Sequence, residues 1–100
     1  MRLTVIWSVQ ARNQYIATLK HIAQEDAHSA SLVHQRVEKS LQLLCGAPEM
    51  GVQAPTVGVR TYAVPKTGHN FDYRRVQDQI YVQRWYRQRQ KPFADKESAP

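Results

Sequence analysis

Arginine and aromatic residues alternate toward the end of the chain, in a pattern that suits the binding of anions. Guanidinium groups are planar, permanently charged and able to stack on aromatic rings. The chain has a net charge of +6, and eight basic residues from Arg60 to Lys91 accompany only two acidic ones. The sequence therefore predicts a cationic surface that attracts a phosphate backbone or an acidic protein segment. The candidate residues for this surface are Arg60, Arg75, Arg84, Tyr86, Arg87 and Arg89.

Two side chains near these arginines could transfer protons. Tyr86 lies within the arginine-rich segment, and His69 lies in the turn that we expect before a strand. Arginine does not release its proton near neutral pH, so acid–base chemistry beside these arginines would need a side chain of another type. The sequence has no zinc spacing, phosphate-binding glycine loop or nucleophile elbow, and we expect neither a metal nor a cofactor.

The elements that position these residues follow from the hydrophobic periodicity. Residues 3–7 are β-branched and aromatic and predict a strand. Ser8 is a suitable N-cap for a helix over residues 9–24, and Asp26 for a second helix that we expect to end with Gly46 at its C′ position. Apolar residues at spacings of three and four give each helix one apolar face, so the helices should pack as an antiparallel hairpin.

The second half of the sequence predicts a loop over residues 47–57 and then a meander of strands. We expect these strands at residues 59–64, 71–76 and 80–86. The order β-α-α-β-β-β predicts an α+β fold, with the helical hairpin packed on a small and mostly antiparallel sheet.

Regular alternation along the last strand would divide its side chains between two faces. One face would carry Ile80, Val82, Arg84 and Tyr86. The other face would carry Tyr81, Gln83, Trp85 and Arg87. We expect packing rather than binding of four aromatic residues: Tyr62, Phe71, Tyr73 and Trp85. The arginines of the last strand remain for binding, with Arg60 and Arg75 expected beside them.

One hundred residues with 42% hydrophobic content are typical of a single folded domain. We expect this domain at residues 1–90 and a flexible tail at residues 91–100, which show no periodicity. No apolar run approaches the roughly 18 residues that a membrane-spanning helix needs. A lone cysteine, Cys45, suits a reducing compartment. We therefore expect a cytoplasmic protein with no membrane partner.

The element order and several local motifs resemble the ParE/RelE superfamily of type II toxins, and most closely its ParE (plasmid stabilisation) branch. The resemblance extends from Val5 to Gln90. It rests on several motifs together. In the first helix these are Ala11 and Arg12 near the start and Ile22-Ala23-Gln24-Glu25-Asp26 at the end. The others are Leu41-Gln-Leu-Leu44 leading into Pro48-Glu49-Met50-Gly51, Gly58-Val59-Arg60, Val64-Pro65, Tyr73-Arg74-Arg75-Val76, and the arginine-rich segment Ile80 to Arg89.

This resemblance implies a toxin encoded beside a cognate antitoxin, either ParD-like or of another type. Members of the ParE branch poison DNA gyrase, and members of the RelE branch cut messenger RNA on the ribosome. We expect the ParE-like activity, not itself enzymatic, because Arg87 stands where many members have a histidine and no clear acid–base pair is present. Two alternatives remain: a RelE-type mRNA interferase with Tyr86 or His69 in acid–base roles, and a homologue that only binds antitoxin.

Overall fold

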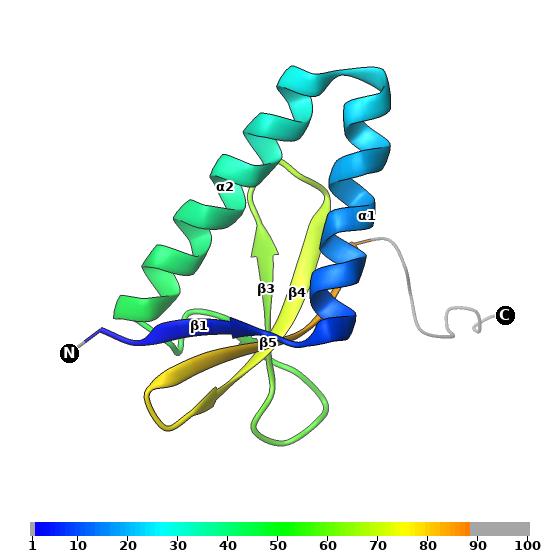
Figure 1. Ribbon diagram of the computed structural model, residues 1–100. Coiled ribbons are helices and arrows are strands. Elements are labelled where there is room, and N and C mark those ends of the chain that lie inside the picture. Colours follow the sequence, from blue (N-terminus) through cyan, green and yellow to red (C-terminus); the bar gives the residue numbers. More distant parts are fainter. Residues whose placement is uncertain (1, 89–100) are drawn as a thin grey trace, which may run out of the picture.

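The structure is a computed structural model that describes residues 2–88. Its elements, in chain order, are β1 (Thr4–Trp7), α1 (Val9–Glu25), α2 (Ala27–Gly46), β2 (Val52–Gln53), β3 (Arg60–Val64), β4 (His69–Val76) and β5 (Gln79–Arg87). The two helices form a hairpin on one side of the sheet (Figure 1). The predicted α+β fold is confirmed. Arg89 and the tail predicted at residues 91–100 lie outside the described residues.

The sheet has five strands in the order β1-β5-β4-β3-β2. Strand β1 pairs in parallel with β5, and the remaining neighbours pair antiparallel. The arginine-rich strand β5 is therefore an inner strand, held between the first strand of the chain and β4. The short strand β2 lies where the sequence predicted only a loop, because two exposed residues give no detectable alternation.

Local side-chain hydrogen bonds start both helices, as predicted. The Ser8 hydroxyl accepts a hydrogen bond from the Ala11 N–H at 2.9 Å, and the Asp26 carboxylate accepts one from the His28 N–H at 3.0 Å. Each cap satisfies a backbone donor that has no partner within its own helix.

The predicted end of the second helix is wrong in its detail. Gly46 is the last residue of α2, and Ala47 follows it as the C-cap. The N–H of Ala47 donates to the carbonyls of Leu43 and Leu44, so the helix closes without a left-handed residue. Among residues 2–88, the glycines with positive φ are Gly58 and Gly68 instead.

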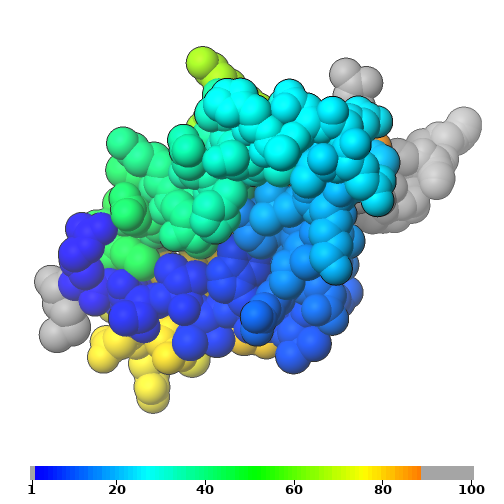
Figure 2. All heavy atoms as spheres, turned by 45° about the horizontal axis from the view of Figure 1, so that its top comes forward, coloured from blue at the N-terminus to red at the C-terminus, as the bar shows by residue number. Residues whose placement is uncertain are grey.

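The hydrophobic core lies between the helical hairpin and the sheet. Figure 2 shows α1, α2 and β1 packed together over this side of the molecule. Tyr15 of α1 stacks on Trp7 with ring centroids 5.0 Å apart and meets Trp85 edge-on at 4.8 Å. The Trp85 indole N–H donates to the Thr18 hydroxyl at 2.9 Å, so the polar group of this buried ring has a hydrogen-bond partner. Phe71, Tyr73 and Trp85 are almost fully buried, which confirms their predicted packing role.

A β-bulge changes which face the end of β5 presents. Asp72 pairs with Arg84, but the next residue of β4 pairs with Val82, so Gln83 has no partner in the register. Beyond this extra residue the alternation is inverted. Trp85 consequently joins Ile80 and Val82 in the core, whereas Arg84 points away from the helices. The predicted placement of Arg84 and Tyr86 on the face of Ile80 and Val82 is wrong for this reason.

Candidate functional site

Four side chains meet on the outer face, the side of the sheet opposite the helices. We call Thr61, Asp72, Arg84 and Tyr86 the outer-face cluster. Asp72 is only 7% exposed, and its Oδ1 accepts hydrogen bonds from the Thr61 hydroxyl at 2.7 Å and the Tyr86 hydroxyl at 2.8 Å. Its Oδ2 lies 3.7 Å from Nη1 of Arg84. The Arg84 guanidinium also lies over the Tyr86 ring, 4.4 Å from the centroid.

The Tyr86 hydroxyl acts as a hydrogen-bond donor within this cluster. Burial, and then the hydrogen bond to Asp72, raise the pKa of the Tyr86 hydroxyl above its ordinary value. The phenol therefore keeps its proton near neutral pH and directs it at Asp72. A general base needs the opposite, a lowered pKa and a free lone pair directed at substrate.

His69 lies on the other side of the sheet. It is the first residue of β4, not part of the preceding turn as predicted, because it pairs with Val64 and Arg87. Its ring stacks on Trp85 with centroids 5.0 Å apart, and its Nδ1 lies 3.0 Å from the Thr67 carbonyl oxygen. As the donor of that hydrogen bond, Nδ1 would leave Nε2 as an acceptor.

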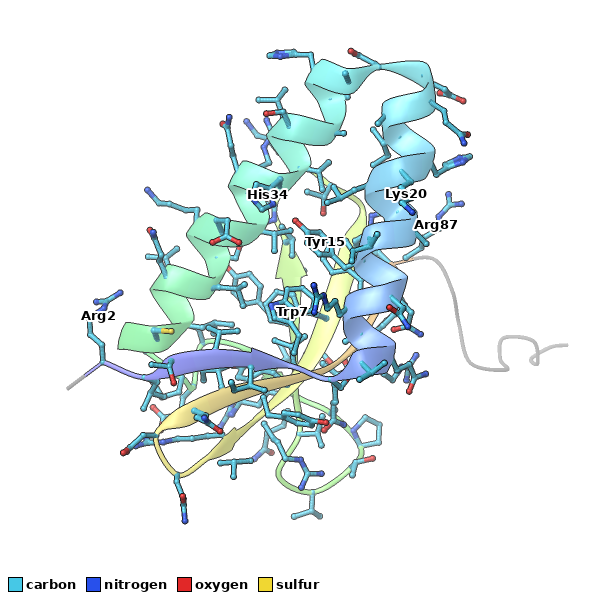
Figure 3. All side chains as sticks on the ribbon, in the orientation of Figure 1. Arg2, Trp7, Tyr15, Lys20, His34 and Arg87 are labelled. Carbon is cyan, nitrogen blue, oxygen red and sulfur yellow. The ribbon has the colours of Figure 1, made fainter. Side chains whose placement is uncertain are left out.

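His69 shares a cleft with Arg87, between α1 and the turn that joins β3 to β4. The cleft has a volume of about 560 Å³, and its lining includes Thr18, His21, His69 and Arg87. Figure 3 shows Arg87 beside α1. Burial is the main cause that lowers the pKa of His69, and the nearby Arg87 charge lowers it further. The imidazole is therefore neutral near pH 7.

The lowered pKa of His69 predicts that acid destabilises the fold. The unfolded histidine, with a pKa of about 6.5, takes up a proton before the folded one does. The contribution of His69 to the free energy of unfolding is therefore complete above that pKa and is lost as the pH falls below it. We expect the melting temperature to fall less between about pH 7 and pH 5 in His69→Asn than in the wild type. An unchanged acid sensitivity, equal to that of the control variant His28→Asn, would contradict this.

Arg60 and Arg75 lie near the opposite end of β4 from His69, rather than beside the arginines of β5 as expected. They line a small cavity of about 200 Å³ together with Glu49 and Arg74. Arg60 Nη1 donates to the Gly51 carbonyl at 2.8 Å, and Arg75 Nε donates to the Gln77 carbonyl at 3.0 Å. Part of the hydrogen-bonding capacity of both arginines thus holds backbone segments in place.

The arrangement therefore has three separate parts. Arg84 and Tyr86 belong to the outer face, Arg87 and His69 to the cleft beside α1, and Arg60 and Arg75 to the far end of the sheet. The outer-face cluster and the cleft are separated by the sheet itself, since successive residues of a strand point to opposite faces.

Among residues 2–88, no group of three or more histidine, cysteine or acidic residues could hold a metal ion. The helices of this same part of the chain are too short or too polar to span a membrane.

Comparison with known protein families gives one decisive match. The family model for the ParE toxin of the type II toxin–antitoxin system parDE matches residues 5–92. The chain belongs to the ParE toxin family. A search among curated proteins gives no significant match. The ParE-family assignment makes the chain a toxin of a type II toxin–antitoxin system.

Solved structures with the same fold include other toxins. The chromosomal ParDE system from P. aeruginosa contains a chain 18% identical, with a TM-score of 0.72, covering 86% of this chain and 96% of that one. A mutant of E. coli RelE in the free state is 12% identical, with a TM-score of 0.65, covering 89% and 86%. The YoeB dimer from Staphylococcus aureus is 15% identical, with a TM-score of 0.61, covering 86% and 97%. At these identities the likeness concerns the fold alone.

The structure also explains a motif of this ParE-family sequence, the segment Pro48 to Gly51. The Tyr73 hydroxyl donates to the Pro48 carbonyl at 2.7 Å and accepts from the Gly51 N–H at 2.9 Å. Arg60 holds the same loop through its bonds to the Glu49 and Gly51 carbonyls. The loop that follows α2 is thus fixed to the sheet by two side chains.

Asp72 and Thr61 are site residues that the sequence did not predict. In the sequence, Asp72 is one of two acidic residues in a basic segment, and Thr61 is an ordinary strand residue. Their importance depends on the cross-strand pairs Thr61–Asp72 and Asp72–Arg84. The pair Asp72–Arg84 could have been predicted only from an alignment of β4 with β5 that includes the bulge at Gln83.

Proposed function

We propose that this ParE-family toxin arrests growth by binding and poisoning DNA gyrase, and that a cognate antitoxin, ParD-like in type, neutralises it. The family match to the toxin of parDE supports this proposal. In it the toxin acts as a binding protein in the cytoplasm, without a cofactor and without chemistry of its own.

The observation that carries the proposal is the separation of the two proton-transfer candidates. RNA cleavage without a metal needs a base, an acid and charge stabilisation around one phosphodiester. The Tyr86 hydroxyl donates to Asp72 on the outer face, and His69 stacks on Trp85 on the helix side. Arginines without an acid–base pair beside them suit binding of an anionic partner. This supports the ParE activity over RelE-type cleavage of messenger RNA on the ribosome.

We place the gyrase contact on β5 and on Arg89, which follows it in the sequence. Arg84 is the central residue, because half of its side-chain surface is exposed on the outer face. Tyr86 supports it from below. Arg87, the last residue of β5, lies on the opposite face of the sheet and would bind a part of gyrase that reaches around the end of the strand. Arg89 lies outside the described residues, and we propose it as a further cation from the sequence alone. Arg60 and Arg75 would contribute charge at the far end of the sheet.

We place the antitoxin on a groove between α2 and the end of β3. Leu43 and Tyr62 form an apolar floor there, and Arg36, Lys39 and Lys66 surround it in a cavity of about 340 Å³. None of these three cations pairs with an acidic side chain within residues 2–88. An acidic amphipathic segment would bury its apolar residues on this floor and pair its carboxylates with the cations.

A gyrase supercoiling assay with purified toxin tests the proposed function. We expect the toxin to inhibit supercoiling at moderate salt and the antitoxin encoded by the adjacent gene to relieve that inhibition. A folded toxin that arrests growth but leaves gyrase active would contradict the proposal and favour cleavage of messenger RNA on the ribosome.

Tyr86→Phe separates the two activities. The variant keeps the ring beneath Arg84 and loses only the hydroxyl that donates to Asp72. A gyrase-binding toxin should keep most of its growth arrest, with a loss of stability of about 1 kcal/mol for one hydrogen bond. An interferase that uses the phenolic proton should lose activity by a factor on the order of 10² or more. Growth arrest and thermal unfolding of the same variant measure both effects.

A further inference from the structure

The buried carboxylate of Asp72 lies beside the partly exposed side chain of Arg84. The residue Asp72 is 7% exposed, whereas the Arg84 side chain is 50% exposed. The two residues are cross-strand partners on β4 and β5, and they are opposite each other only because the bulge skips Gln83. The chain therefore places a negative charge beside an exposed cation of the outer face.

The two oxygens of Asp72 have different surroundings. Oδ1 accepts both neutral hydrogen bonds, from Thr61 and from Tyr86. These bonds fix the plane of the carboxylate and leave Oδ2 directed toward Arg84. The Tyr86 ring holds the guanidinium from a second direction, with Cζ of Arg84 4.4 Å from the ring centroid.

The distance between Asp72 and Arg84 is informative. At 3.7 Å, Nη1 of Arg84 and Oδ2 of Asp72 attract each other by charge but lie too far apart for a good hydrogen bond. Within residues 2–88 no hydrogen bond occupies the N–H donors of the guanidinium, which therefore remain available for a partner. A long exposed arginine otherwise loses rotamer freedom on binding, and a prior constraint reduces that cost.

We propose that Asp72 is a positioning residue that holds Arg84, with Tyr86, in the orientation in which it binds an anionic group of the target. This inference rests on the proposed function, in which Arg84 contacts gyrase. Asp72 does not touch the target itself, and it acts only through Arg84.

Asp72→Asn tests the inference, with Asp78→Asn as the matched control. Both changes raise the net charge by the same amount, but Asp78 is exposed in the turn between β4 and β5. Among the described residues, its one hydrogen bond is that of its backbone carbonyl, which accepts from the Thr4 N–H. We expect Asp72→Asn to weaken gyrase inhibition about fivefold, the scale of one well-placed ion pair, and Asp78→Asn to leave it unchanged. In an Arg84→Ala background, Asp72→Asn should cause no further loss, because the two residues act as a unit. An additive loss in that background, or full inhibition by Asp72→Asn, would overturn the inference.

A second measurement tests the positioning without gyrase. NMR relaxation of the Arg84 Nε–H should show an ordered side chain in the wild type and in Asp78→Asn, and a mobile one in Asp72→Asn. Thr61→Val removes one of the two hydrogen bonds that orient the Asp72 carboxylate, and it should increase the mobility of the Arg84 side chain by a smaller amount. This variant replaces Asp72→Asn in the test if Asp72→Asn does not fold. Equal order in all these variants would overturn the positioning role. A wild type with an ordered Arg84 and no effect on gyrase would instead refute the proposed function alone.

Discussion

Replacement of Arg84 and Arg87 together by alanine should abolish growth arrest by the toxin expressed without its antitoxin. Both side chains lie at the end of β5, and both residues are exposed, so their loss leaves the core intact. A hydrogen bond to a charged partner contributes on the order of 1.5–3 kcal/mol. Loss of two such contacts should weaken target binding by a factor of about 100 or more. Growth of cells after induction, with thermal unfolding of the purified variant, measures the effect.

The single variants show which side of the sheet meets the target. Arg84 belongs to the outer face, whereas Arg87 lines the cleft with His69. If the outer face carries the contact, Arg84→Ala should cause most of the loss. Arg12→Ala, an exposed arginine near the start of α1, is the matched control and should remain toxic. Full toxicity of a folded Arg84→Ala, Arg87→Ala variant would show that the contact lies elsewhere.

Gly51→Ala should destabilise the fold by about 2–4 kcal/mol, the sum of overpacking and lost hydrogen bonds. A Cβ at this position would lie 2.7 Å from Oη of Tyr73, 2.8 Å from its Cε1 and 2.9 Å from the Thr61 carbonyl oxygen. Tyr73 is buried and the Thr61 oxygen belongs to the backbone, so neither can easily move away. To make room for the Cβ, the loop would have to move away from the Tyr73 ring. That movement would break the hydrogen bonds between the Tyr73 hydroxyl and the backbone of Pro48 and Gly51.

Urea denaturation of Gly51→Ala beside Gly46→Ala measures this effect. An added Cβ at Gly46, the last residue of α2, would meet only the end of the Arg2 side chain at an ordinary 3.5 Å. Gly46→Ala should therefore be neutral or slightly stabilising. Tyr73→Phe should lose part of the stability that Gly51→Ala loses, because it removes the hydroxyl without a clash. Equal stability of Gly51→Ala and the wild type would refute the tight contact between this loop and the sheet.

Local patterns in the sequence were sufficient for the helical hairpin and for the family. The periodicity of each helix and its N-cap, Ser8 or Asp26, involve residues within about one turn of each other. The same is true of the segment Pro48 to Gly51, whose sequence indicates the ParE branch independently of its contact with Tyr73. The cationic character of β5 also follows from composition alone. These predictions needed no knowledge of which strands are neighbours.

The assignment of the site residues to faces depended on tertiary structure. The Ser8 hydroxyl, which caps α1, also donates to the carbonyl of Gln83 at 3.2 Å, across 75 positions of the chain. That contact lies at the bulge, where the extra residue turns Arg84 outward toward Asp72 and returns Trp85 to the core. By itself the sequence determined the fold class, the helices and the charge of the last strand, because these depend on near neighbours and composition. The register decided which arginine meets which partner, because one inserted residue reverses every side chain beyond it.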